Sequence, residues 1–227
     1  MSTLKTTNLQ HPSAGVPAIV LDAAGDATYA GVHDFSAATV TGAGGLQLIT
    51  PTSINNTGGT ASATGGEISF TDVLAFRLNG VFTSVYQNYQ IIGELTSTDN
   101  AGIAILARFS VAGTDTTANY HSNQFSQTST VLAGIDNSFG TDDFQVSWWG
   151  SSAYQGYSAF NAIVNRPQLA TPTTVTSNGF FKNNTGVRVQ YVTAAFHEGT
   201  TAFDGINFTP TAGTITGKIR VYGFKNS

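Results

Sequence analysis

Residues 211–224 read T-A-G-T-I-T-G-K-I-R-V-Y-G-F and alternate without a break. Every second residue from Ile215 to Gly223 falls on one side of the segment, and every second residue from Thr216 to Phe224 falls on the other. This period of two is typical of a strand with one face on a core and the other towards water or a neighbouring chain. So regular a strand near the end of the sequence predicts that the last segment closes a sheet.

The sequence from Glu67 onwards carries the same kind of signal in shorter segments. No stretch sustains a period of 3.6 residues, so almost no helix is expected. Turns are predicted at Ser97–Gly102, Ala112–Asp115, Asp136–Asp143, Asn178–Asn184 and Gly199–Asp204. Strands are predicted at Ile68–Phe70, Val73–Phe82, Tyr89–Leu95, Ile103–Val111, Asn119–Gln127, Val131–Ala133, Phe144–Trp149, Tyr157–Val164, Thr173–Thr176, Gly186–Phe196 and Thr214–Phe224. Strands at this spacing indicate an all-β sandwich or barrel.

The first part of the chain differs from the rest. Short strands are predicted at Ala18–Leu21 and Ala27–Tyr29, and two such strands do not hold together alone in water. This segment therefore packs on its own domain, on symmetry mates or on a host structure, or it is a partly ordered arm. The segment N-N-T-G-G-T-A-S-A-T-G-G at 55–66 is low in bulk, with a flexible composition. We therefore place a boundary there, between an arm at 1–65 and a β-sandwich domain at 66–227.

The composition excludes several classes of protein. Only 10% of the 227 residues are charged, against roughly 25% in ordinary soluble domains. The net charge is −4 and the nine basic residues are scattered, which argues against nucleic acid as a partner. There is no cysteine for a disulfide, no apolar run long enough for membrane insertion, and no apolar secretory segment near the N-terminus. A surface so poor in charge favours burial of sheet edges between subunits.

Two blocks of sequence resemble phage tail-fibre and virion-surface proteins, particularly those of marine and cyanobacterial phages. The first is L-K-T-T-N-L-Q-H-P-S-A-G-V-P-A-I-V-L-D-A-A-G-D-A-T at 4–28. The second comprises F-T-S-V-Y-Q-N-Y-Q-I-I at 82–92, G-T-D-T-T-A-N-Y at 113–120 and the segment T-A-F-D-G-I-N-F-T-P that leads into 211–224. The matching blocks bracket most of the chain, from residues 4–29 and 81–224.

This resemblance implies a jelly-roll-like antiparallel β-sandwich with an extended N-terminal arm, displayed as a homotrimer on a virion assembled in the host cytoplasm. Such proteins are usually not enzymes, and they contact other virion proteins at one end and the host at the other. The chain has no heptad or β-helical shaft, which leaves a short tail fibre or fibre tip that recognises a host-surface polysaccharide. The alternative is a trimeric capsid decoration or cement protein; the remote alternative is a carbohydrate-active enzyme. The expected attachment and trimer contacts in the arm are Leu9, Pro12, Ile19 and Leu21.

The aromatic cluster around Trp148-Trp149 is the most suggestive candidate site. If the strand alternates, one tryptophan faces the core and the other faces out. An exposed aromatic ring among Ser, Gln and Gly is the kind of surface on which a sugar ring stacks, so the predicted glycan contacts are Trp149, Tyr154 and Tyr157. The competing interpretation buries one tryptophan in the core and the other between subunits.

No residue pattern predicts a catalytic or cofactor site. His197-Glu198 opens like a zinc-protease motif but lacks a histidine four residues later, so His197 is expected at the surface or at a subunit contact. Most carboxylates lie in predicted turns, where Asp usually bonds its own backbone, whereas a glycosidase needs two opposed carboxylates. The oxygen-rich segment Asp136–Asp143 either holds Ca²⁺ or forms an ordinary turn. The expectation is therefore a protein without a cofactor that is not an enzyme.

Overall fold

The computed structural model describes residues 8–9, 19–21, 27–29, 45–98, 103–128, 132–148, 157–183 and 186–225. The chain forms two compact units, residues 1–43 and residues 44–227. Every regular element in the described ranges is a strand, which confirms the predicted all-β class. Within those ranges no helix is long and apolar enough to cross a membrane.

The first unit contains a small antiparallel sheet of three strands in the order β1-β2-β3. The strands are β1 (Asn8–Leu9), β2 (Ile19–Leu21) and β3 (Ala27–Tyr29). Both predicted strands of this region are therefore present, and Leu9 lies opposite Ile19 in the sheet. Pro12 lies outside the described residues, and the attachment role of this unit stays a prediction.

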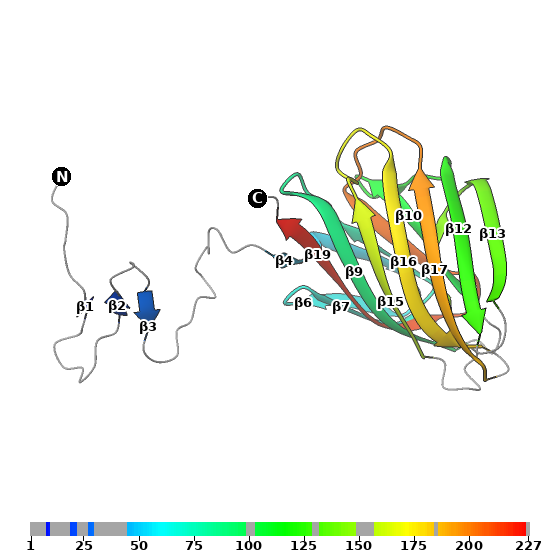
Figure 1. Cartoon of the computed structure of the whole chain (residues 1–227), viewed down its shortest axis with the longest axis horizontal. Coiled ribbons are helices and arrows are strands. Elements are labelled where there is room, and N and C mark those ends of the chain that lie inside the picture. The colour runs from blue at the N-terminus through cyan, green and yellow to red at the C-terminus, as the bar shows by residue number, and fades with distance from the viewer. Residues whose placement is uncertain are drawn as a thin grey trace. The chain divides into compact units, whose positions relative to one another are not determined.

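The second unit contains two larger antiparallel sheets. The strands of the first are β4 (Leu46–Ile49), β6 (Thr60–Thr64), β7 (Glu67–Val73), β9 (Tyr86–Ser97), β12 (Tyr120–Thr128), β13 (Leu132–Thr141), β15 (Tyr157–Asn165), β16 (Thr173–Lys182), β17 (Arg188–His197) and β19 (Ile215–Lys225). Their order is β13-β12-β17-β16-β15-β9-β19-β7-β6, and β4 also pairs with β19. Figure 1 shows β9, β15, β16, β17, β12 and β13 side by side in one broad layer.

The second sheet is smaller and supplies the other layer of the sandwich. Its strands are β5 (Ser53–Thr57), β8 (Ala75–Asn79), β10 (Ala104–Val111), β11 (Thr114–Asp115), β14 (Phe144–Trp148) and β18 (Gly205–Pro210). Their order is β11-β10-β18-β8-β5, with β14 also paired to β10. From β7 to β10 the chain changes sheet at every step, and it returns to the small sheet at β14 and β18. The two layers confirm the predicted antiparallel β-sandwich.

Strand β19 lies inside the large sheet, between β9 on one side and both β7 and β4 on the other. Ile215, Ile219, Val221 and Gly223 are buried, as the alternation at 211–224 predicts. The core beneath is rich in aromatic rings: the Phe70 ring centroid lies 4.4 Å from that of Phe76. The terminal strand therefore joins two parts of the sheet over a continuous apolar core.

The boundary between the units lies earlier than predicted. Residues 55–66 were expected to be a flexible boundary segment, but β5 and β6 lie there. Strand β5 pairs with β8 and β6 pairs with β7, so backbone hydrogen bonds hold residues whose side chains are too small to show an apolar period. The contacts place the boundary between Ala43 and Gly44 rather than after residue 65.

Two predicted turns are strands. The turn expected at Asn178–Asn184 is occupied by β16, which continues to Lys182 and pairs with both β15 and β17. The turn expected at Asp136–Asp143 is mostly β13, where Asp136 lies opposite Gln124 of β12. In both places pairing with a neighbouring strand outweighs the turn preference of Asn, Asp and Gly.

Candidate functional site

A groove of about 250 Å³ lies on the outer face of the large sheet, where β15, β9 and β19 run side by side. The sheet register places Tyr157 opposite Thr96, and Thr96 opposite Thr216. The next residue of β15, Ser158, is fully buried, so Tyr157 points away from the core. The groove is lined by Glu94, Leu95, Thr96, Tyr157, Thr216, Gly217 and Lys218.

The Tyr157 ring forms one wall of the groove. Its side chain is 52% exposed, which is unusual for a large aromatic residue. Its hydroxyl donates a hydrogen bond to Oε2 of Glu94, at 2.9 Å. This bond to a carboxylate, with some help from burial, raises the pKa of the Tyr157 hydroxyl above its ordinary value. The ring is therefore exposed yet held in one orientation, which suits a flat ligand.

The floor of the groove requires glycine at position 217. A Cβ atom built there would lie 2.1 Å from the carbonyl oxygen of Glu94, so β9 and β19 could not keep their spacing with any other residue. Gly217 lines the groove between Thr216 and Lys218. Beside it, the Thr96 hydroxyl is exposed and donates to the backbone oxygen of Thr216, at 3.2 Å.

Charged groups on the other side of the groove are paired with one another. Lys218 Nζ lies 2.6 Å from Oε1 of Glu67, and Arg220 contacts the second oxygen of the same carboxylate. The hydrogen bond from Lys218 is the largest influence that lowers the pKa of Glu67. Glu94 is the one carboxylate among the residues that line the groove. The groove therefore offers an aromatic ring, a carboxylate, an ammonium group and hydroxyls to a ligand.

The predicted glycan contacts are only partly within the described residues. Tyr157 lies in the groove, while Trp149 and Tyr154 lie outside the described ranges. Strand β14 ends at Trp148, whose backbone lies opposite Ala104 of β10. Sequence reasoning missed Glu94, Thr216 and Lys218 as neighbours of Tyr157. The alternation had placed Thr216 and Lys218 on the same side of their strand, but it did not predict which strands lie beside them.

His197 is not at the surface, which corrects the prediction. Its side chain is 1% exposed, and its ring meets those of Tyr120 and Phe203 edge to face, at 4.7 and 4.9 Å between centroids. Burial in this aromatic setting lowers the pKa of His197. The sequence contained the pattern that predicts this burial. Val189 and Tyr191 face the core, and the same alternation continued along β17 places His197 on the inner face.

The segment Asp136–Asp143 does not form the loop that was considered for Ca²⁺. Only Asp142 and Asp143 follow the end of β13, and both face Arg108 of β10. Arg108 Nη2 lies 3.3 Å from Oδ2 of Asp143, and Arg108 Nε donates to the Asp142 carbonyl, at 3.0 Å. A guanidinium group already occupies the position of a cation. Across the described ranges, no three His, Asp or Glu side chains are grouped to hold a metal ion.

Comparison with known proteins gives little beyond this geometry. No family model matches the chain, and no curated protein matches it. Among solved structures, the chain is similar to the CBM2 module of Lactobacillus casei BL23 phage J-1 evolved Dit, at 8% identity over 83% of this chain and 93% of that one. The TM-score is 0.28, and at that level the likeness carries no argument about fold or function.

Proposed function

We propose that this chain is a non-enzymatic structural protein of a phage virion, a short tail fibre or fibre tip that binds a host-surface glycan. The observation that carries the proposal is the exposed Tyr157 ring, held by Glu94 beside a glycine floor. The resemblance of the blocks at 4–29 and 81–224 to phage fibre proteins supplies the phage part of the proposal.

The chemistry of the groove suits a sugar. The face of an aromatic ring packs against the C–H groups of a pyranose, and a tyrosine held in place loses little freedom when it binds. The Glu94 carboxylate can accept hydrogen bonds from sugar hydroxyls, and Lys218 can donate to sugar oxygens. The Thr96 hydroxyl, which donates to Thr216, can accept a hydrogen bond from a sugar hydroxyl. The groove is shallow and open, so a single copy binds weakly. Three copies in a homotrimer would bind a repetitive cell surface by avidity.

A second candidate, a trimeric capsid decoration or cement protein, is favoured by a different observation. The outer face of the large sheet also carries a group of exposed apolar side chains that includes Phe125, Phe180 and Val192. The register places Phe125 opposite Val192, with Phe180 on the next strand. Exposed apolar side chains grouped on one face suit permanent contact with a neighbouring subunit better than reversible contact with a sugar.

The experiment measures binding of the immobilised chain to purified host-surface polysaccharide by biolayer interferometry. Tyr157→Ala should weaken binding at least about tenfold, the effect of losing about 1.4 kcal/mol. Phe180→Ala is the matched control, because Phe180 is an equally exposed aromatic residue on the same face. Equal binding by both variants would remove the Tyr157 groove from the proposal. A cryo-EM map of the particle separates the two candidates, with density at the tail for the first and on the capsid lattice for the second.

A further inference from the structure

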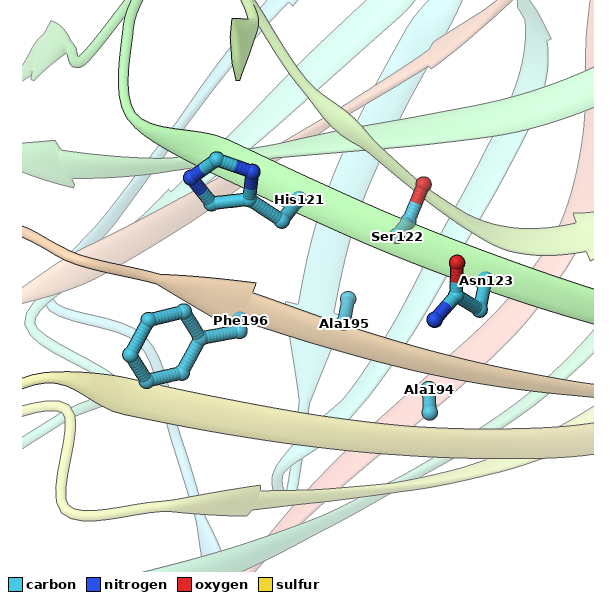
Figure 2. Close-up of a pocket in the computed structure, with 6 residues that line it drawn as sticks. All are labelled: His121, Ser122, Asn123, Ala194, Ala195 and Phe196. Atoms are coloured by element: carbon cyan, nitrogen blue, oxygen red, sulfur yellow. The ribbon is translucent and has the colours of Figure 1, made fainter. Parts of the chain in front are cut away.

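A second hollow, of about 170 Å³, lies on the outer face of the same sheet, over β12 and β17. Figure 2 shows it between the rings of His121 and Phe196 on one side and the side chains of Asn123 and Ala194 on the other. The register explains the grouping: His121 lies opposite Phe196, and Asn123 lies opposite Ala194. Two neighbouring cross-strand pairs thus form the hollow, one of them aromatic and the other small and polar.

The hollow exists because residue 194 is alanine. The Ala194 methyl group is exposed and leaves an open floor beside the half-buried Phe196 ring. The His121 and Phe196 ring centroids are 6.3 Å apart, at 37° between the planes, so the rings form a wall without closing over the floor. A larger side chain at 194 would fill this space.

The polar groups at the rim are ordered and accessible. His121 Nε2 lies 3.3 Å from Oε1 of Glu198, which holds the imidazole ring in place. Asn123 is exposed, and its amide group carries both a donor and an acceptor. The hollow therefore presents an apolar floor and wall next to an amide that can pair with another amide.

We infer that this hollow binds the acetamido group of an N-acetylated amino sugar. The hollow, of about 170 Å³, has room for a group of a few heavy atoms. An acetamido group has four heavy atoms, and the sugar ring that carries it would lie over the open side of the hollow. The methyl group lies on Ala194 and against Phe196, and the N–H and C=O groups pair with Asn123.

The inference rests on the proposed function in one respect, that the outer face binds a glycan. The two sites lie at opposite ends of their strands. Phe196 of β17 lies opposite Thr174 of β16, and the same row continues through Asn165 of β15 to Asn88 of β9. Asn88 lies at the start of β9, whereas Thr96, which lines the Tyr157 groove, lies near the end of β9. An interval of about eight residues along a strand corresponds to about 26 Å. One extended polysaccharide could therefore contact both sites at sugars several residues apart.

The experiment titrates the full chain with N-acetylglucosamine and, separately, with glucose, and follows backbone amide signals by NMR. N-acetylglucosamine should shift the signals of Asn123 and Ala194, and glucose should leave them in place. Ala194→Val should remove the shift, because valine fills the floor and favours a strand. Gln190→Val is the matched control on the same face of β17, and it should bind as the unmodified chain does.

A second variant tests the amide pairing. Asn123→Ala should weaken binding of N-acetylglucosamine at least about fivefold while Ala194 stays unchanged. Equal shifts with both sugars, or undiminished binding by Ala194→Val, would overturn the inference. If the chain binds host polysaccharide through Tyr157 but N-acetylglucosamine shifts no signal at Asn123 or Ala194, the inference about the hollow is overturned and the proposed function stands. If N-acetylglucosamine shifts the Asn123 signal but the chain does not bind host polysaccharide, the inference about the hollow is supported and the proposed function is rejected.

Discussion

The Tyr157 hydroxyl donates a hydrogen bond to Oε2 of Glu94 across the pair of strands β15 and β9, at 2.9 Å. The two residues are 63 positions apart in the sequence, and the pairing of Ala159 with Glu94 brings them together. This bond turns an exposed ring into an oriented one. It also places a carboxylate at the rim of the groove, where sugar hydroxyls would compete for it.

The hydrogen bond and the ring can be separated by mutation. Tyr157→Phe keeps the aromatic face and removes the hydroxyl, so polysaccharide binding should fall only about twofold to fivefold. Glu94→Gln removes the negative charge and should weaken binding more than Tyr157→Phe does, because hydrogen bonds to charged groups are the stronger ones. Biolayer interferometry measures both variants. If Tyr157→Phe binds as poorly as Tyr157→Ala, then the hydroxyl and not the ring makes the contact.

The buried Tyr120 hydroxyl should stabilise the sandwich. It accepts a hydrogen bond from the backbone N–H of Phe109, at 2.8 Å, and burial raises the pKa of this hydroxyl. Tyr120→Phe leaves that N–H without its partner inside the core. The expected loss is about 1–3 kcal/mol of the free energy of unfolding, measured by urea denaturation. Tyr222→Phe, at a half-buried position of β19, is the control and should cost less than half as much.

His197 should make the fold sensitive to acid between pH 8 and pH 5. Its pKa is lowered in the folded chain from 6.5, chiefly by burial, so the unfolded chain takes up the proton first as the pH falls. The unfolded state binds more protons in that range, and the free energy of unfolding therefore decreases with falling pH. Urea midpoints at pH 8 and pH 5 measure the effect.

The matched variants assign that pH dependence to one residue. His197→Phe should reduce the difference between the two midpoints, because phenylalanine has no proton to gain. His121→Gln is the control at a partly exposed histidine, and it should keep most of the difference. A full pH dependence in His197→Phe would show that other groups cause it.

Calcium should not stabilise the protein. The Arg108 guanidinium lies against the carboxylates of Asp142 and Asp143, which leaves no place there for a cation. Melting temperatures in EDTA and in millimolar CaCl₂ should therefore agree within error by differential scanning calorimetry. A rise of several degrees with calcium would point to a site elsewhere in the chain.

The success of the sequence analysis depended on how strongly each strand alternates. Residues 211–224 carry bulky residues on one face, and they predicted β19 with its buried face. Strands β5 and β6 consist of Thr, Ser, Asn and Ala with one Ile, so no period marks them, and only pairing with β8 and β7 makes them strands. The same holds for the polar β13, which is held by β12.

The candidate site was harder to predict than the fold. Glu94 and Lys218 lay within predicted strands, and Tyr157 was singled out as aromatic. Their meeting depends on strand order and register, which join β15 to β9 and β9 to β19. The residues of one strand do not determine which strand lies beside it or in which register, because the same alternation is compatible with several neighbouring strands.

The position of β19 has a consequence for the order in which the protein matures. This strand follows β4 to β18 in the sequence, yet it alone joins β9 to β7 and β4. Before β19 is made, the strands from β9 to β13 in the sheet order, the β6–β7 pair and β4 are therefore three separate parts of the large sheet, and their unpaired edges can pair with the wrong chain. Pairing between strands that are far apart in the sequence forms slowly. Misassembly is therefore expected mainly where neighbouring ribosomes synthesise several copies of this chain at once.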